Sequence, residues 1–217
     1  MRRALAMAAL IACTLGASPS PAASPASQAH EIIQKMLDRN PSLHSYRSRV
    51  HVSLRMLSFP YLAPKLDGTS YFKRPDNYVV EFDRVPGYAK GFSTLFDAVG
   101  DPAAWSKDQN VVLDGRSTLD GRPMLVLRLT KKIPSSILAY SLALVDAQTY
   151  DLKRMEWHYT SGGTIVMIQT YRSQGSYAVL DSQHATIDIP HIRAVADSTY
   201  GPYETNVALN DTVFASR

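Results

Sequence analysis

The clearest periodic pattern in this chain of 217 residues is SYRSRVHVSLRM, which runs from Ser45 to Met56. The apolar positions are Tyr46, Val50, Val52, Leu54 and Met56, and the polar positions between them are Arg47, Arg49, His51, Ser53 and Arg55. This period of two predicts a β-strand with one buried face and one solvated face. At about 3.3 Å per residue, the strand would span roughly 40 Å. A strand of this length is typical of a large, curved antiparallel sheet.

Further stretches with strand-like composition follow, and turn signals separate them. The predicted strands span residues 70–73, 78–84, 111–113, 124–131, 137–146, 152–160, 164–172, 177–180, 186–189 and 192–196. The turn signals are Arg74-Pro75-Asp76-Asn77, Asp114-Gly115, Asp120-Gly121 and the hairpin signal Ser161-Gly162-Gly163. Because the connections are short, we expect antiparallel neighbours rather than crossovers.

Two helices are predicted as well. The first has apolar residues at helical spacing, with Ser27 as N-cap and Asn40-Pro41 as the stop. Its apolar positions are Ala29, Ile32, Ile33, Met36 and Leu37. Only one face is apolar, so this helix should lie on another element. The second is predicted from Gly91 to Ser106, with Asp101-Pro102 breaking it.

The N-terminal segment has the layout of a secretory signal. Arg2 and Arg3 precede an apolar run over residues 4–15, and a region rich in Ala, Ser and Pro follows. The run is too short for a membrane span, which needs about 20 residues. We therefore expect residues 1–26 to be a signal peptide with its processing segment, and residues 27–217 to be a single exported domain.

Leu10-Ile11-Ala12-Cys13 offers a second interpretation of this segment. It resembles a lipobox, in which Cys13 is acylated and becomes the mature N-terminus. The Ser/Pro/Ala stretch would then be a flexible tether. Cys13 is the single cysteine of the chain, so a disulfide within the chain and a cysteine-based zinc site are both excluded.

Composition and motifs restrict the function classes. The chain has 23 Lys and Arg against 19 Asp and Glu, a small surplus without a concentrated basic stripe, which argues against nucleic acid as a partner. Neither a His-Glu-x-x-His pair, a Gly-x-Ser-x-Gly elbow nor a Gly-rich phosphate loop is present. We therefore expect a protein that is not an enzyme and that has no metal or cofactor. The competing interpretation is a hydrolase whose site is assembled from scattered residues such as His184 and His191.

The stretch Gly68–Asp76, GTSYFKRPD, resembles a motif of LolA/LolB-type lipoprotein carriers and their outer-membrane lipoprotein-sorting relatives. That family shows a signal peptide, a helix, a long first strand and a Gly-led strand ending in Lys-Arg-Pro, and the same order occurs here. The strand 142–146, the hairpin 154–169 and the closing stretch 203–206 are similar too. The segment 91–106 and the tail 192–217 depart from the pattern of the classical carriers.

The resemblance implies a mainly β, α+β fold: an antiparallel, unclosed β-barrel, or half-barrel, covered by a helical lid. The cavity beneath the lid would hold acyl chains or the lipid anchor of a lipoprotein. The family's arginine of Lys-Arg-Pro corresponds to Arg74, which would help to hold the lid and control release of the acyl chain. Arginine suits this task because its planar group offers five donors and keeps its charge. The alternative is an ordinary turn arginine beside Pro75.

An acyl chain needs a dry groove more than a polar site, since each buried methylene contributes about 0.8 kcal/mol. An alternating strand that faces a helical lid provides such a groove where the core is incompletely filled. The candidate ligand-binding residues are Val50, Val52, Leu54, Met56, Arg74, Val80, Phe82, Leu127, Trp157 and Met167.

Taken together, these observations predict an exported monomeric carrier or sensor in the periplasm or cell envelope. Its expected ligand is an acyl chain or the lipid moiety of a lipoprotein, and an envelope membrane is a further expected partner. The alternative is an interaction or regulatory module with the same fold and a filled core, anchored to the envelope through Cys13. The arginines Arg47, Arg49 and Arg55 would form either a basic patch for lipid headgroups or a solvated outer face.

Overall fold

The computed structural model describes residues 23–75, 77–85 and 102–215. In chain order the elements are α1 (Pro25–Leu37), β1 (Ser45–Met56), β2 (Lys65–Lys73), β3 (Asn77–Phe82), α3 (Pro102–Asp108), β4 (Gln109–Leu119), β5 (Arg122–Lys131), β6 (Leu138–Asp146), β7 (Leu152–Tyr159), β8 (Thr164–Gln174), β9 (Tyr177–Ile189), β10 (Ile192–Thr205) and the 3₁₀ helix η2 (Asp211–Phe214). None of the helices in these ranges is long and apolar enough to cross a membrane.

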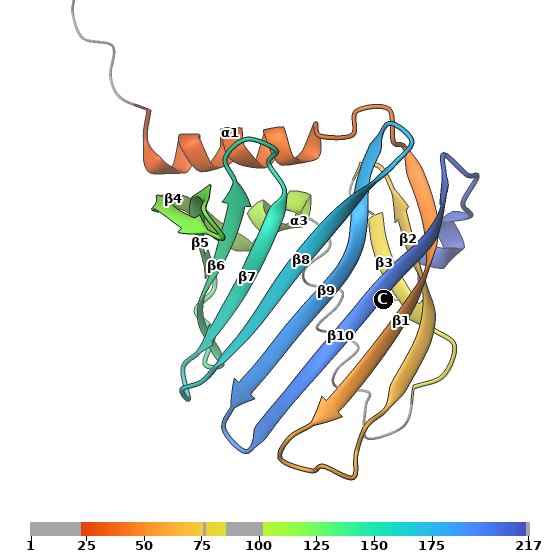
Figure 1. Cartoon of the computed structure of the whole chain (residues 1–217). Coiled ribbons are helices and arrows are strands. Elements are labelled where there is room, and N and C mark those ends of the chain that lie inside the picture. The colour runs from red at the N-terminus through yellow and green to blue at the C-terminus, as the bar shows by residue number, and fades with distance from the viewer. Residues whose placement is uncertain (1–22, 76, 86–101, 216–217) are drawn as a thin grey trace, which may run out of the picture.

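The strands form one antiparallel sheet in the order β3-β2-β1-β10-β9-β8-β7-β6-β5-β4. The sheet curls into an open barrel with β3 and β4 as its two edges, and α1 lies across one end (Figure 1). The predicted unclosed antiparallel barrel with a helical lid is therefore confirmed. Because neighbouring strands are antiparallel, their connections fall alternately at the end near α1 and at the opposite end.

The predicted long strand is β1, and its bounds are those expected from the alternation. Its even-numbered positions from Ser48 to Met56 are buried, while the positions between them are exposed. On the exposed face, Arg47 pairs with Glu204 at 2.6 Å and Arg49 pairs with Asp83 at 2.8 Å. That face is therefore a solvated surface with internal ion pairs.

Helix α1 begins earlier than predicted. Ser24, not Ser27, is the N-cap, and its Oγ accepts a hydrogen bond from the Ser27 backbone N–H at 3.2 Å. Pro25 fits the first helical position because proline has no N–H to satisfy there. The helix ends at Leu37, before the predicted stop, with Asp38 as its C-cap.

Several strand boundaries differ from the prediction. The predicted strands 177–180 and 186–189 are parts of one strand, β9, which runs through the polar residues between them. Asp114-Gly115 is not a turn but a bulge within β4, where the register with β5 shifts. Pro102 starts α3 rather than breaking a helix, and residues 91–101 of that predicted helix lie outside the described ranges.

Gly68, the first residue of the GTSYFKRPD stretch, is required by close packing between β2 and β3. A Cβ atom at this position would lie 2.4 Å from the carbonyl oxygen of Glu81. Real Cβ atoms do not approach backbone oxygen this closely, so any side chain at residue 68 would separate the two strands.

Two hydrophobic clusters fill most of the inner face of the sheet. The larger joins Ile32 and Ile33 of α1 and Trp105 of α3 to side chains of the sheet such as Leu127 and Met155. The smaller is built around Val50, Val52, Leu66, Val179, Tyr200 and Tyr203. The larger cluster fixes α1 on the sheet, because the buried face of the helix belongs to it.

The turn between β6 and β7 is organised by the buried carboxylate of Asp146. Its Oδ1 accepts hydrogen bonds from the backbone N–H groups of Gln148 at 2.9 Å and Thr149 at 3.0 Å. Its Oδ2 lies 3.2 Å from Nη1 of Arg122. Burial by itself raises the pKa of Asp146, but these donors outweigh it and hold that pKa below its ordinary value.

Candidate functional site

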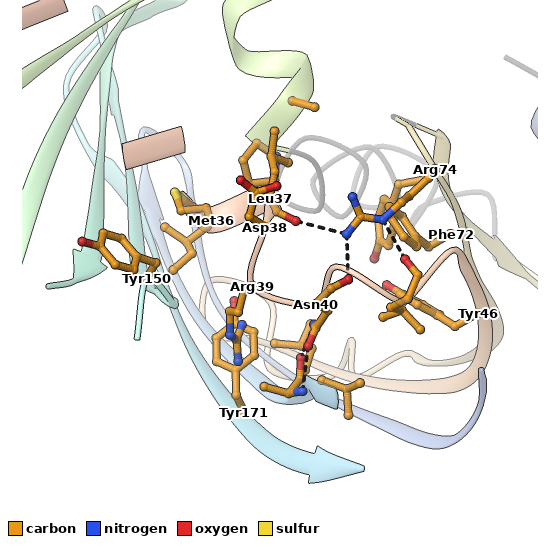
Figure 2. A pocket seen from close by; sticks show the side chains of 18 of the residues that line it. Met36, Leu37, Asp38, Arg39, Asn40, Tyr46, Phe72, Arg74, Tyr150 and Tyr171 are labelled. Carbon is orange, nitrogen blue, oxygen red and sulfur yellow. Dashed lines mark hydrogen bonds between the residues drawn. The ribbon is translucent and has the colours of Figure 1, made fainter. Parts of the chain in front are cut away.

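A cavity of about 450 Å³ lies beneath the C-terminal end of α1 and the loop that follows it (Figure 2). Its walls come from α1, from β1–β3, from β8–β10, from the turn between β6 and β7, and from the first residues of α3. Pockets that bind small molecules in proteins measure about 300–1,000 Å³. The volume is therefore sufficient for one small ligand.

Aromatic rings form much of the cavity wall. They belong to Tyr46, Phe72, Tyr78, Tyr150, Tyr171 and Tyr203. The ring of Tyr46 stacks on Phe72, with centroids 5.3 Å apart, and meets Tyr203 edge-on at 5.1 Å. Burial raises the pKa of Tyr46, Tyr171 and Tyr203 above the ordinary tyrosine value, so these hydroxyls stay neutral. The part of the wall that these tyrosines form is therefore uncharged. Most of the cavity surface is carbon.

Arg74 holds the C-terminal end of α1 and the loop after it. Its Nε donates to the carbonyl oxygen of Leu43 at 2.7 Å, and its Nη2 donates to the carbonyl oxygens of Asn40 at 2.7 Å and Leu37 at 3.2 Å. The last carbonyls of a helix have no partner within the helix, so a cation placed there stabilises it. The structure thus contains the contact between Arg74 and the lid carbonyls that the resemblance implied.

Asn40 fastens the same loop to β9. Its Nδ2 donates to the carbonyl oxygen of Ala178 at 2.9 Å, and its Oδ1 accepts from the backbone N–H of Ala178 at 3.0 Å. The amide side chain therefore pairs with one residue of the sheet as a neighbouring strand would. This reciprocal pair closes the loop over the cavity.

Arg39 makes a third attachment, to the turn between β6 and β7 and to β8. Its Nε lies 2.5 Å from Oδ1 of the buried Asp151, whose Oδ2 lies 2.9 Å from Nζ of Lys153. The Arg39 guanidinium also lies over the Tyr171 ring, 4.3 Å from its centroid. Figure 2 shows Arg39 and Arg74 on opposite sides of Asn40. The loop is thus held from several strands at once.

One of the ten predicted ligand-binding residues, Arg74, lies on the cavity wall. The others belong to the two hydrophobic clusters. Leu54, Met56, Leu127, Trp157 and Met167 are in the larger one, and Val50 and Val52 are in the smaller one, with Val80 and Phe82 packed against it. Alternation identified the inner face of the sheet, but it does not show which part of that face other side chains cover. A ligand contact at these nine residues stays a prediction.

Among the cavity residues that the sequence reasoning missed are the tyrosines, Phe72, Arg39, Asn40 and Leu180. Arg39-Asn40 directly follows the predicted apolar helix, which is the one signal that could have placed them at the lid. Asp151 lies far away in sequence, and nothing in the sequence pairs it with Arg39.

The histidines considered for a scattered hydrolase site are not gathered into a site. His184 lies on the exposed face of β9, with Nδ1 2.6 Å from Oδ1 of Asp197, and His191 is exposed in the following turn. Within residues 23–75, 77–85 and 102–215, no group of three or more His, Cys, Asp or Glu side chains is placed to hold a metal ion.

No family model matches the sequence, and no curated protein matches it either. Solved structures do match the fold. An outer membrane lipoprotein-sorting protein domain from Vibrio parahaemolyticus has a TM-score of 0.69 at 10% identity, over 87% of this chain and 97% of that chain. A DUF1329 family protein from Desulfovibrio piger has a TM-score of 0.68 at 13% identity, over 88% and 98%.

A LolA superfamily protein from Nitrosomonas europaea has a TM-score of 0.63 at 14% identity, and the match covers 89% of this chain and 98% of that chain. Each of these matches covers 87–89% of this chain. At such low identities they define the fold alone. The chain has the LolA-like fold: an unclosed antiparallel barrel covered by helices.

Proposed function

We propose that this protein is a non-enzymatic carrier or sensor that binds the acyl part of a lipid, either free or as the anchor of a lipoprotein, in the cavity beneath α1. The observation that carries the proposal is the cavity of about 450 Å³ between the lid and the aromatic wall. The LolA-like fold agrees with it, since two of the matched structures are an outer membrane lipoprotein-sorting domain and a LolA superfamily protein.

The energetics support an apolar chain as ligand. Burying ten methylenes would contribute on the order of 8 kcal/mol before the costs of association are subtracted. Two glutamines on the wall already have hydrogen-bond partners for their side-chain oxygens. Oε1 of Gln169 accepts from the Tyr171 hydroxyl at 2.8 Å, and Oε1 of Gln183 accepts from the Tyr200 hydroxyl at 2.6 Å.

Lipid extraction and mass spectrometry of the purified protein test the proposal. We expect co-purified lipid or fatty acid in a ratio near one per chain, because the cavity has room for one small ligand. Protein that carries no lipid and also fails to bind a fluorescent fatty acid would rule the proposal out.

A second candidate function has its own support. The inner face of the sheet along β1 is covered by packed side chains, as expected of an interaction module with a filled core. Such a module would be anchored to the envelope through an acylated Cys13. Growing cells with a radioactive fatty acid distinguishes the two candidates. The anchored module requires that the parent protein carries the label and that the Cys13→Ser variant carries none.

Export to the periplasm or cell envelope belongs to the same proposal. Both Ser20-Pro21-Ala22 and Ser24-Pro25-Ala26 present small residues to a signal peptidase. Cleavage after Ala22 would keep Ser24, the N-cap of α1, whereas cleavage after Ala26 would remove it. We therefore expect processing after Ala22, and the N-terminal sequence of the secreted protein tests this.

A further inference from the structure

Where β3 ends, residues 83–85 leave the sheet toward the end of the barrel opposite α1. At this end the structure also describes four complete connections between strands: residues 57–64, 132–137, 160–163 and 190–191. We call these connections the loop rim. The strand order places all of them at the same end of the sheet, away from the cavity lid (Figure 1). Backbone hydrogen bonds hold the rim in place, from Leu57 N–H to the carbonyl of Arg193 in β10 at 2.7 Å and from Thr160 N–H to the Ile137 carbonyl at 2.9 Å.

The loop rim carries most of the large exposed apolar side chains in the described part of the chain. The described part of the chain has six large hydrophobic side chains with substantial exposure, namely Leu57, Phe59, Tyr61, Ile133, Ile137 and Ile168. All except Ile168 lie in the first two rim connections. Ile133 is 83% exposed, Tyr61 is 80% exposed and Ile137 is 66% exposed. Because both connections lie at the same end of the sheet, their apolar side chains can contact one extended partner together.

The charged side chains at this end indicate which kind of partner would bind there. The four rim connections contain no aspartate and no glutamate. Arg55 and Lys65, which flank the connection 57–64, are exposed and form no ion pair with any described residue. Of the acidic side chains toward this end, Asp108 pairs with Lys131, Asp83 pairs with Arg49 and Asp188 lies 3.8 Å from Arg193. Asp67 lies 2.5 Å from Nδ1 of His51. The end is therefore apolar at its tips and basic at its margin.

We propose that the loop rim docks this protein on an anionic phospholipid membrane, with Tyr61 and Ile133 inserted at the interface. A bilayer interface accepts separate protruding side chains because lipids move around them, whereas a protein partner needs a continuous complementary surface. Tyrosine suits the interface, since its ring is apolar and its hydroxyl is wet. Arg55 and Lys65 would then lie at the level of the lipid headgroups.

Vesicle flotation of the full-length protein tests this, with vesicles of phosphatidylcholine alone and of phosphatidylcholine mixed with phosphatidylglycerol. The parent should float with the anionic vesicles, and added salt should weaken that binding. Tyr61→Ser combined with Ile133→Ser should bind about tenfold less. Ile168→Ser, which changes an exposed isoleucine on the outer face of β8, should bind like the parent.

A second pair of variants tests the charges. Arg55→Gln with Lys65→Gln should weaken binding to the anionic vesicles, while Arg116→Gln, at an exposed arginine of β4, should not. Residues 1–22 are the same in every variant, so differences between variants report the rim alone. Because all these side chains are exposed, thermal unfolding should match the parent in each case.

Three results would overturn the inference. The first is a parent that stays in the soluble fraction with both kinds of vesicle. The second is a Tyr61→Ser and Ile133→Ser variant that floats like the parent. The third is a parent dimer that the same two substitutions dissociate, which would make a second copy the partner. None of these results affects the proposed cavity function, because the rim lies at the other end of the barrel and fatty-acid binding is measured separately.

Discussion

Nη2 of Arg74 lies 2.7 Å from the carbonyl oxygen of Asn40, which connects the corner between β2 and β3 to the loop after α1. The side chain of Asn40 in turn pairs with Ala178, and the preceding residue, Arg39, pairs with Asp151. One short loop over the cavity is thus held by the β2–β3 corner, by β9 and by the turn between β6 and β7. Opening the lid at this end requires that some of these attachments break.

Arg74→Leu should leave the protein folded but less stable by about 2–4 kcal/mol, because three carbonyl oxygens lose a charged donor. Bound fatty acid should dissociate faster, since the lid loses its attachment to the β2–β3 corner. Urea unfolding and stopped-flow release of a fluorescent fatty acid measure the two effects. Arg74→Lys should restore only part of the lost stability and only part of the slow ligand release. A single ammonium group cannot reproduce the contacts of the planar guanidinium. Equal release rates for the parent and Arg74→Leu would show that Arg74 is an ordinary turn residue.

Asn40→Ala should lower the free energy of unfolding by about 1–2 kcal/mol, since both polar groups of Ala178 lose their partner. The same substitution at Asn110, which is exposed on β4, should change stability by less than about 0.5 kcal/mol. Thermal unfolding of both variants provides the comparison. If Asn40→Ala and Asn110→Ala lowered the free energy of unfolding equally, the reciprocal pair between Asn40 and Ala178 would not stabilise the closed loop.

A double-mutant cycle measures the attachment between Arg39 and Asp151. Arg39→Gln, Asp151→Asn and the double variant should give a coupling energy of about 1–3 kcal/mol, because the pair is largely buried and its atoms are in contact. Lys153 also neutralises Asp151, so Arg39→Gln alone should cost less than the loss of the carboxylate. A coupling near zero would indicate that solvent already screens the pair.

Stability in acid should depend on Asp146. Its pKa is lower in the folded protein than its ordinary value of 3.8, so the carboxylate contributes its full stabilisation above that value. The contribution should decline as the pH falls below 3.8 and should vanish below the folded pKa. Asp146→Asn should therefore be less stable than the parent at pH 7, with a smaller loss of stability on acidification. Urea unfolding as a function of pH measures this, with Asp120→Asn, at an exposed turn, as the control expected to follow the parent.

The sequence predicted the elements whose signal is local. β1 was predicted to the residue because its alternation has no interruption, and Gly162 and Gly163 form the predicted hairpin with φ angles of +88° and +82°. β9 was divided into two predicted strands because polar residues interrupt its middle. There, the buried Gln183 is satisfied by Tyr200 from β10, a partner that local sequence does not reveal.

The cavity itself could be predicted only in part. The resemblance implied contacts between Arg74 and lid carbonyls, and Arg74 donates to carbonyl oxygens of the adjoining helix and loop. Its role in ligand release stays a prediction. The predicted apolar wall was placed along β1, where Val50 and Leu54 are in fact packed within the core clusters. Whether an inward-facing side chain meets a ligand or another side chain depends on how far the lid lies from the sheet, and that spacing is set by tertiary packing.

The most direct test of the central claim is titration of the protein with a long-chain fatty acid, comparing the parent with Leu180→Trp. Leu180 lines the cavity, so the larger side chain should occupy the space that the ligand needs. Val166→Trp on β8, outside the cavity lining, is the matched control. We predict one ligand per chain for the parent and for Val166→Trp, and at least tenfold weaker binding for Leu180→Trp. Equal binding by Leu180→Trp and the parent, or no binding by the parent, would contradict the assignment of this cavity as a lipid site.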